Sequence, residues 1–495
     1  MTTSVETLEP TAVWRFFAEL SAVPRPSKHE EQARAYVRQV ADRHGFPVRE
    51  DAAANLVVDV PASPGAESAP TTVLQGHLDM VCEKNAGTQH DFLRDGLRLH
   101  VDTDEKGVQI VRADGTTLGA DNGLGVALAL AAATDPAVRR GPLEILCTSD
   151  EEMGMTSAKA LDPGLLRGRR MINLDSEEDD CVYIGCAGGC DTSLIWELKL
   201  APPPARAAAG RVQVSGLRGG HSGVDIHLNR GNALKVLTRV LCTADPQRLR
   251  LAALTGGSKR NVIPREACAV VVGPPRIADT LTRAAAEIQA ESRQGGEADC
   301  TITVTPTALG ELPGAVGPGD TQQLLTTLAA LPHGVLAVVP DIPGLVQTSN
   351  STSTIEGSAA GGTLRVVVGC LSRSSSLPEL RATARQLAAI GKLAGATVES
   401  GNEYPGWQPN ANSPLLAICR RVYEQLLQAS PTVAAIHAGL ECGILGERVG
   451  AGAMDMVSFG PHIRGAHSPD ERVYVASVQK TWTFLKAVLA ELARP

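Results

Sequence analysis

Residues with metal-binding chemistry recur along this sequence at points where an apolar, strand-like segment ends. The five clusters are His77 and Asp79 in QGHLDM, Asp121 in LGADNG, Glu151 and Glu152 in SDEEMG, Asp175 in NLDSE, and His467 in AHSPDE. In an open α/β sheet the carboxyl ends of the strands meet at one edge, where ligands bind. Imidazoles and carboxylates are ligands of Zn²⁺. The recurrence therefore predicts an α/β fold that gathers these residues around a polynuclear metal site.

Each cluster taken alone has an ordinary structural explanation. Asp121 could cap the helix that follows it, because carboxylates are favourable near helix N-termini. Glu151 and Glu152 could belong to a solvated acidic loop, Asp175 could cap a turn, and His77 could end a strand beside a surface aspartate. These explanations would all have to hold independently, so the joint pattern favours the metal site.

The predicted site has the groups that amide hydrolysis needs. Two divalent ions roughly 3.5–4 Å apart can activate water and polarise a carbonyl. An aspartate can bind one ion with each oxygen, and a further carboxylate must carry the proton. Glu151 and Glu152 could divide the roles of proton carrier and metal ligand, since consecutive residues in a turn point in different directions.

Composition limits the classes of protein that this chain can be. Its 495 residues suggest two or three domains, and a net charge of −8 without a basic run argues against nucleic-acid binding. The apolar stretch GLGVALALAAA is too short to span a bilayer. The N-terminus lacks the pattern of a signal peptide, and eleven cysteines without a framework pattern indicate reduced thiols in a cytoplasm.

Strands and helices alternate up to the Ala/Pro-rich segment APPPARAAAG, which begins at Ala201. We expect an α/β catalytic domain with a mixed sheet over residues 1–202 and 405–495. An α+β domain over residues 203–404 would be inserted into it, because Asp175 and His467 lie on either side. Ser27 and Glu30 have the spacing of a capping box before a helix that ends at Gly45.

The five motifs, together with GGHSGVDIHLNRGNA, resemble the metallopeptidase family M20 over nearly the whole chain. The middle region, HAGLECG and AHSPDERV are most similar to its aminoacyl-histidine dipeptidase branch. The resemblance implies two zinc ions bridged by Asp121, which would have a cis peptide bond to Asn122. The remaining implied ligands are His77 and Asp175 for one ion and Glu152 and His467 for the other. It further implies that Glu151 is the general base and that Asp79 supports His77.

The resemblance extends to the middle region, which often serves as a lid and a dimerisation domain. His221 would stabilise the oxyanion, with Asn261 as a partner. Arg373 suits a C-terminal carboxylate, and Glu441 suits an N-terminal amine. From the residues alone, His221 and Asn261 could equally be ordinary turn residues, and Arg373 and Glu441 could be solvated.

We therefore expect a cytoplasmic, homodimeric dipeptidase that prefers Xaa-His substrates such as carnosine and has no nucleic-acid or membrane partner. Zinc is the expected metal, while Mn²⁺ and Co²⁺ also suit such ligands. An aminoacylase or deacetylase of the same fold is the alternative enzyme. A catalytically inactive relative that binds metal or peptide is the alternative of a different class, and the presence of Glu151 argues against it.

Overall fold

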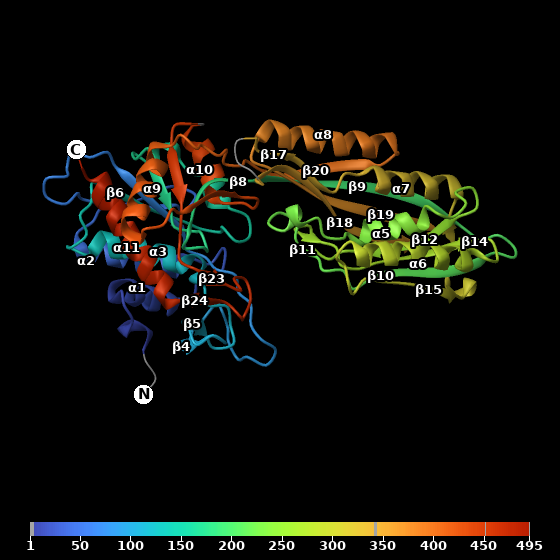
Figure 1. Cartoon of the computed structure of the whole chain (residues 1–495), viewed down its shortest axis with the longest axis horizontal. Helices are drawn as coiled ribbons and strands as arrows, with labels where there is room; N and C mark the ends of the chain where they lie inside the picture. Colours follow the sequence, from blue (N-terminus) through green and yellow to red (C-terminus); the bar gives the residue numbers. More distant parts are fainter. Residues whose placement is uncertain (1–3, 341–343, 451, 495) are drawn as a thin grey trace. The chain divides into compact units, whose positions relative to one another are not determined.

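The computed structural model describes residues 4–340, 344–450 and 452–494. The chain forms two compact units, each with its own sheet and helices (Figure 1). Unit 1 consists of Met1–Cys186, Trp407–Ala435 and Leu440–Pro495, and unit 2 of Ala187–Gly406 and Ile436–Gly439. Strands and helices are mixed in both units, which confirms the predicted α/β class.

Unit 1 is built on an eight-stranded mixed sheet. Its order is β1 (Val48–Glu50), β2 (Leu56–Val60), β6 (Leu143–Thr148), β3 (Thr72–His77), β7 (Arg170–Asn173), β22 (Asp455–Ser458), β8 (Cys181–Cys186) and β21 (Thr432–Ile436). The central strands β6, β3, β7 and β22 run parallel, whereas β1 and β2 pair antiparallel. Every residue of β3 and β6 is buried, as expected for parallel strands covered on both faces.

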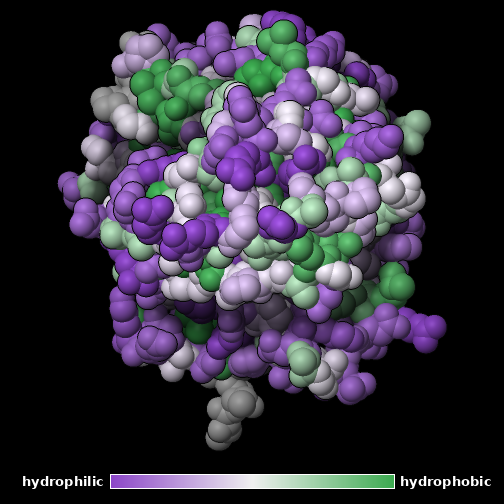
Figure 2. Space-filling model, turned by 90° about the vertical axis from the view of Figure 1, so that its right-hand side faces the viewer, coloured by the Kyte–Doolittle hydropathy of each residue, from purple (hydrophilic) through white to green (hydrophobic). Residues whose placement is uncertain are grey.

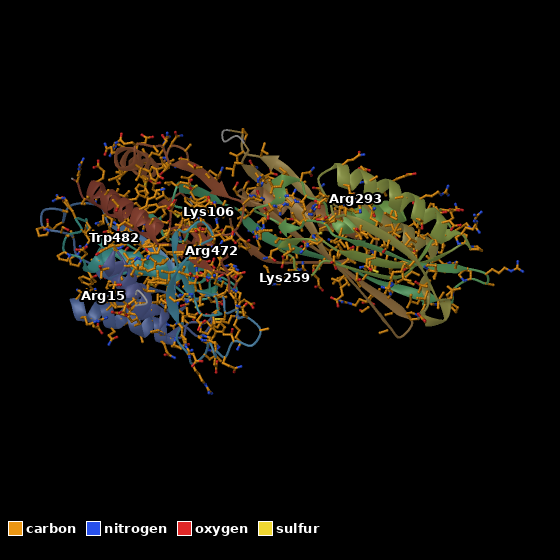
Figure 3. All side chains as sticks on the ribbon, turned by 60° about the horizontal axis from the view of Figure 1, so that its bottom comes forward. Arg15, Lys106, Lys259, Arg293, Arg472 and Trp482 are labelled. Carbon is orange, nitrogen blue, oxygen red and sulfur yellow. The ribbon has the colours of Figure 1, made fainter. Side chains whose placement is uncertain are left out.

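Helices complete unit 1: α1 (Thr11–Ser21), α2 (Glu31–His44), α3 (Ala120–Thr134), α4 (Thr156–Lys159), α9 (Pro414–Leu427), α10 (Glu441–Val449) and α11 (Val475–Leu492). The apolar run noted in the sequence lies in α3, which is buried along almost its whole length because it packs against both α1 and β3. Trp482 on α11 is also buried (Figure 3). Among the described residues, no helix has the length and apolarity to cross a membrane.

A small antiparallel sheet in unit 1 carries one of the predicted ligands. Its order is β23 (Ile463–Arg464), β24 (Arg472–Tyr474), β5 (Gln109–Ala113) and β4 (Leu99–Thr103). The loop between β23 and β24 contains His467, which has a left-handed backbone conformation with φ of 63°. This sheet therefore holds the C-terminal motif beside a strand that precedes α3 in the sequence.

Unit 2 contains a second, larger sheet in which all recorded pairings are antiparallel. Its main path is β15 (Thr301–Thr307), β10 (Ala208–Ser215), β14 (Ala267–Gly273), β12 (Arg250–Gly256), β18 (Val346–Ala360), β19 (Thr363–Ser374), β9 (Gly188–Ala201) and β16 (Ala315–Val316). Strand β17 (Gly334–Val338) pairs with β18, and β20 (Thr397–Tyr404) pairs with β9. A two-residue ladder joins β11 (Gly220–His221) to β13 (Val262–Ile263).

The helices of unit 2 are α5 (Ala233–Leu241), α6 (Ile277–Gln294), α7 (Pro318–Ala330) and α8 (Leu377–Leu393). Aliphatic side chains from these helices and from the large sheet form one continuous core. Aromatic residues contribute little to it, in keeping with their 3% share of the sequence.

The face drawn in Figure 2 is mostly hydrophilic, with smaller hydrophobic groups among the polar side chains.

The first boundary between the units differs from the predicted one at residue 203. Unit 2 begins at Ala187, because β9 pairs with β19 from Gly188 to Lys199 and therefore belongs to the large sheet. The Ala/Pro-rich segment begins at the last residue of β9, so it marks a strand end within unit 2 rather than the junction. The return to unit 1 at Trp407 lies close to the predicted position.

Candidate metal centre

Three neighbouring parallel strands carry the predicted ligands to one edge of the sheet in unit 1. His77 is the last residue of β3 and lies opposite Thr148, the last residue of β6. Glu151 and Glu152 lie three and four residues after the end of β6, and Asp175 lies two residues after the end of β7. Because the strands are parallel, their carboxyl ends coincide, as the sequence pattern predicted.

Asp121, in the first turn of α3, lies at the middle of this group. Its Oδ1 is 3.1 Å from His77 Nε2, and its Oδ2 is 3.2 Å from His467 Nε2. His77 Nε2 is also 3.3 Å from Asp175 Oδ1, and His467 Nε2 is 3.1 Å from Glu152 Oε2. The two oxygens of Asp121 thus face two separate sets of side chains, each with one imidazole and one further carboxylate.

Three sets of side chains in this region bring potential ligand atoms within 4.8 Å of one another. One contains His77, Asp121 and Asp175, and another contains Asp121, Glu152 and His467. These two sets share only Asp121. The third contains His77, Glu151 and Glu152, so geometry alone would also allow Glu151 to bind metal.

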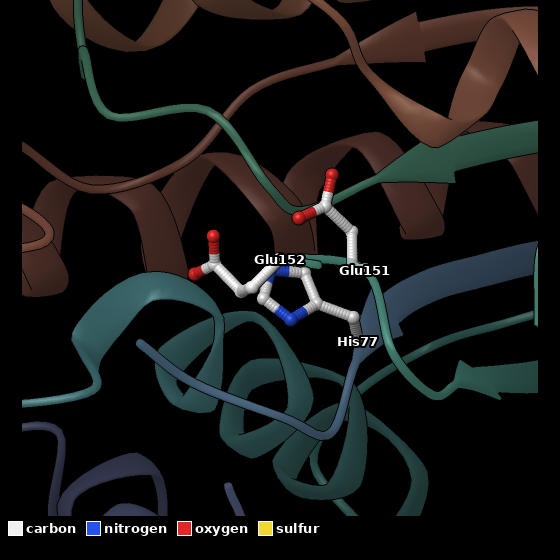
Figure 4. Close-up of side chains that lie close together, drawn as sticks. All are labelled: His77, Glu151 and Glu152. Atoms are coloured by element: carbon white, nitrogen blue, oxygen red, sulfur yellow. The ribbon is translucent and has the colours of Figure 1, made fainter. Parts of the chain in front are cut away.

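Asp79 is fully buried and supports both sides of the group. Its Oδ1 lies 3.3 Å from His77 Nδ1 and accepts a hydrogen bond from the amide of Glu151. Its Oδ2 accepts from the amide of Glu152 and from the hydroxyl of Ser27. One carboxylate therefore holds the turn that presents Glu151 and Glu152. Figure 4 shows their carboxyl groups pointing in different directions.

Burial and charge shift the proton affinities of these groups. Burial raises the pKa of Glu151 well above its usual value. Hydrogen bonds to Asp121 and Glu152 raise the pKa of His467 to about 11. Burial by itself would lower the pKa of His77, but the carboxylates of Asp175 and Asp121 outweigh this effect and raise it. The carboxylate-rich edge therefore attracts positive charge strongly.

The side chains fit divalent cations. Asp175 Oδ1 and Glu152 Oε1 are buried, and neither has a hydrogen-bond partner among the residues that the structure describes. Burying a carboxylate oxygen without a partner is costly, whereas a cation held by each of the two sets would offset the charge of the carboxylate in that set. The mixture of nitrogen and oxygen donors suits Zn²⁺.

Two other buried residues, for which the sequence indicated no such contacts, hold the backbone of the site. Glu471 accepts hydrogen bonds from four successive amides, those of residues 118–121, at the start of α3. Asn122, joined to Asp121 by the cis peptide bond that the resemblance implied, accepts from the amide of His77 and donates to the carbonyl of Leu174. Each of these contacts joins segments far apart in the sequence, so local pattern could not reveal them.

The predicted capping box is wrong. Helix α2 begins at Glu31, so Glu30 rather than Ser27 occupies the N-cap position, and no side-chain cap hydrogen bond forms there. The Ser27 hydroxyl donates instead to Asp79 at 2.7 Å, and the Glu30 carboxylate accepts from the amides of Lys28 and Asp150. The hydrogen-bonding groups of both side chains are therefore paired with loops of the metal centre and not with the first turn of α2.

Glu441 lies beneath the same sheet edge, at the start of α10, and is completely buried. One of its oxygens accepts hydrogen bonds from Gln75 Nε2 and Thr148 Oγ1. Its other oxygen, Oε1, is buried and has no hydrogen-bond partner among the described residues. Burial raises the pKa of Glu441 to about 8. The sequence alone left open that Glu441 is solvated, and the structure shows that it is buried.

The remaining predicted residues belong to unit 2. The Nδ1 atom of His221 accepts from the amides of Gly223 and Val224, so its Nε2 carries a proton in the neutral ring. This Nε2 lies 3.4 Å from Nη2 of the buried Arg373, whose Nη1 donates to the hydroxyl of Tyr404. Asn261 is exposed, and its carbonyl accepts from the amide of Ser222.

His437 is a further buried residue of unit 2 that sequence reasoning missed. Its Nε2 is hydrogen-bonded to Ser349 Oγ at 2.7 Å. Burial, together with the charges of Arg373 and His221, lowers the pKa of His437 to about 3. All eleven cysteines of the chain, in both units, are free thiols.

Comparison with known proteins agrees with this architecture. Residues 73–491 match the peptidase family M20/M25/M40, and the chain belongs to this family. It is 39% identical to the cytosol non-specific dipeptidase of Escherichia coli (strain K12), over 98% of both chains. The crystal structure of an aminoacylhistidine dipeptidase from Vibrio alginolyticus is 38% identical and has a TM-score of 0.87, with 99% of this chain and 98% of that chain covered. A tripeptidase from Staphylococcus aureus, with 14% identity and a TM-score of 0.61, shares the fold.

Proposed function

We propose that this chain hydrolyses dipeptides with a pair of divalent metal ions. The observation that carries the proposal is Asp121, whose two oxygens face His77 and His467 at 3.1 and 3.2 Å. His77 and Asp175 would hold one ion, Glu152 and His467 would hold the other, and Asp121 would serve both. Zinc is the proposed metal, and Mn²⁺ or Co²⁺ would suit the same donors.

When bound, the two ions would supply Lewis-acid polarisation of the scissile carbonyl and activation of water. The residues of the chain would carry the proton. Glu151 takes one proton from water as the water oxygen attacks the carbonyl carbon. It then delivers this proton to the amine nitrogen as the C–N bond breaks. Asp79 keeps Glu151 in place, because it accepts a hydrogen bond from the Glu151 amide.

We assign the recognition of substrate charge to unit 2 and to Glu441. His221 Nε2 and Arg373 Nη2 are both donors and lie 3.4 Å apart. Arg373 Nε is also buried without a partner among the described residues. This pair therefore suits an oxyanion and a C-terminal carboxylate, with Asn261 as a further amide donor. Glu441 would attract the N-terminal amine.

We propose Xaa-His dipeptides such as carnosine as preferred substrates. The aminoacylhistidine dipeptidase from Vibrio alginolyticus supports this preference, while the Escherichia coli relative is named a non-specific dipeptidase. The latter name also supports a cytoplasmic location. A homodimer, in which the middle domain pairs two subunits, is proposed from the family resemblance alone.

The test compares hydrolysis rates for β-Ala-His, Gly-His, Gly-Leu and an N-acetyl amino acid, with metal content measured on the same preparation. We expect two zinc ions per chain, with the two His dipeptides cleaved fastest. Equal rates for Gly-His and Gly-Leu would contradict the proposed preference for a C-terminal histidine. Cleavage of the N-acetyl amino acid alone would identify an aminoacylase of the same fold.

A further inference from the structure

Arg25 is a buried cation whose hydrogen bonds all go to backbone carbonyls. Its side chain is 1% exposed, and no carboxylate oxygen of the described residues lies within ion-pair distance of it. Nη1 donates to the carbonyls of Leu78 and Asp79, both at 3.0 Å, and Nη2 donates to the carbonyl of Gly119 at 2.6 Å. A buried charge is expensive unless it is well hydrogen-bonded, so its retention at this position needs a reason.

The carbonyls that Arg25 binds lie on the two segments that bring together the imidazole and the shared carboxylate. Leu78 and Asp79 directly follow His77 at the end of β3, and Gly119 lies just before Asp121 at the start of α3. His77 Nε2 and Asp121 Oδ1 are 3.1 Å apart. The guanidinium thus links the two backbone segments that carry His77 and Asp121.

Two positions that pack against the Arg25 guanidinium, Gly119 and Gly123, have no room for a side chain. A Cβ atom at Gly119, which has a φ of 64°, would lie 2.4 Å from Arg25 Nη2. A Cβ atom at Gly123 would lie 2.7 Å from the same nitrogen. The two glycines of LGADNG therefore allow α3 to start against the arginine side chain.

The residues that follow Arg25 contact a third loop of the metal centre. Ser27 donates to Asp79 Oδ2, and Glu30 accepts from the amide of Asp150, next to Glu151. We call residues 25–30 the brace segment. Through Arg25, Ser27 and Glu30 it reaches the ends of β3 and β6 and the start of α3.

We propose that Arg25 is a positioning residue of the metal centre. It fixes the separation of His77 and Asp121 and thereby sets the affinity for the metal pair. The planar guanidinium has donors fixed in a fork, so it can bind carbonyls of both segments at once. A lysine ammonium is a single compact point and cannot span the same carbonyls. The inference rests on the two-metal site proposed above.

The test measures zinc binding by the full-length, metal-free chain in competition with a chromophoric chelator. The variants are Arg25→Lys, which keeps the charge, and Arg25→Met, which removes it. The control is Arg170→Met. Arg170 also donates to carbonyls, those of Pro70 and Leu492, but lies at the amino end of β7, opposite the metal edge. Far-ultraviolet circular dichroism checks the folding of each variant.

We expect zinc affinity to fall about 10- to 100-fold in Arg25→Lys, as is typical when an outer-shell contact of a metal site is lost. The loss in Arg25→Met should be at least as large, and Arg170→Met should bind zinc as the wild type does. If Arg25→Met fails to fold, Arg25→Lys decides the question. Wild-type affinity in folded Arg25→Lys, or an equal loss in Arg170→Met, would overturn the inference. Failure of the wild type itself to bind two zinc ions would instead refute the proposed function.

Discussion

Glu151 and Glu152 are neighbours in sequence, yet their carboxylates have different surroundings. Glu152 lies 3.1 Å from His467, whereas the Glu151 carboxylate has no recorded ion pair among the described residues. We expect Glu151→Gln to lower kcat by about 10²- to 10⁴-fold, the usual contribution of a general base. Metal content should stay at the wild-type level. The measurement pairs steady-state kinetics with elemental analysis.

The matched control is Glu152→Gln, which should lose metal as well as activity. Loss of metal in Glu151→Gln would mean that Glu151 is itself a ligand, as the third ligand set permits. An unchanged rate in Glu151→Gln would remove this residue from the mechanism.

Asp79 supports the centre through four contacts, and asparagine can replace only part of them. The NH2 group of the introduced asparagine would face either the Glu151 amide, or the Glu152 amide and the Ser27 hydroxyl, all of which are donors to Asp79 in the wild type. We expect Asp79→Asn to weaken zinc binding about 10- to 100-fold. Chelator competition measures this loss. Wild-type affinity would show that the turn holds its shape without the carboxylate.

At this scale the sequence predicted the imidazoles and carboxylates that the structure brings together, and it missed the residues that hold their backbone. His77, Asp121, Glu152, Asp175 and His467 were predictable because each ends a strand-like segment or lies in a polar motif. Arg25 and Glu471 act on backbone atoms of distant segments, so nothing in their own neighbourhoods indicates a role. Their partners become visible only when the chain is folded.

Among the helices, α5 has the best-defined N-terminal cap. Asn232 accepts from the amides of Leu234 and Lys235 and also donates to the carbonyl of Thr352 in β18. Asn232→Ala should lower the free energy of unfolding by about 1–2 kcal/mol, because a cap is lost and a buried carbonyl is left unpaired. Urea denaturation measures the change.

Ser376 provides the control for this prediction. It occupies the N-cap position of α8 but makes no side-chain cap hydrogen bond. Ser376→Ala should change the free energy of unfolding by less than about 0.5 kcal/mol. Equal losses in the two variants would show that capping is not the source of the effect.

Strand β2 carries an ion-pair network whose contribution depends on pH. Burial by itself would raise the pKa of Asp59, but hydrogen bonds from Arg49 and Arg167 outweigh it and lower the pKa. The folded chain therefore binds the Asp59 proton more weakly than the unfolded chain. The stabilisation is present above the unfolded pKa of about 4 and is lost as the pH falls through the lower folded value.

We expect Asp59→Asn to lower the melting temperature at pH 6 and to have a smaller effect below pH 4. Thermal unfolding of both proteins across this range measures the difference. A difference that grows as the pH falls would contradict the assigned direction of the shift.

The ends of helices and strands were predictable where neighbouring residues determine them. They were not predictable where pairing with a distant strand determines them. Ser413 caps α9 as its position before an apolar run suggests, and Gly45 ends α2 in a left-handed conformation. In contrast, composition placed the start of the inserted domain after β9, although the partners of β9 assign it to unit 2. Pairing between strands distant in sequence has no local signature.

For the whole molecule, the metal centre should stabilise the two units unequally, because all five proposed ligands belong to unit 1. One zinc site stabilises the folded state by about 2.7 kcal/mol when free zinc is 100-fold above Kd. We expect a chelator to abolish activity and to speed hydrogen exchange in the loops of unit 1, with zinc restoring both. The exchange of α5 and α6 should not change. Faster exchange in unit 2 alone would contradict the assignment of the ligands.

The two-part organisation followed from the separation of Asp175 and His467 in the sequence, whereas the order of the strands did not. Strand β22 lies between β7 and β8, although the whole of unit 2 separates it from both in the sequence. During translation, β7 and β8 emerge first and must wait for the strand that joins them. At about 5–20 residues per second, a ribosome needs roughly 14–54 s to make the 272 residues that run from the end of β8 to the end of β22. For that time the nascent chain presents an open sheet edge of the kind that invites aggregation, and early chaperone contact at this gap would protect it.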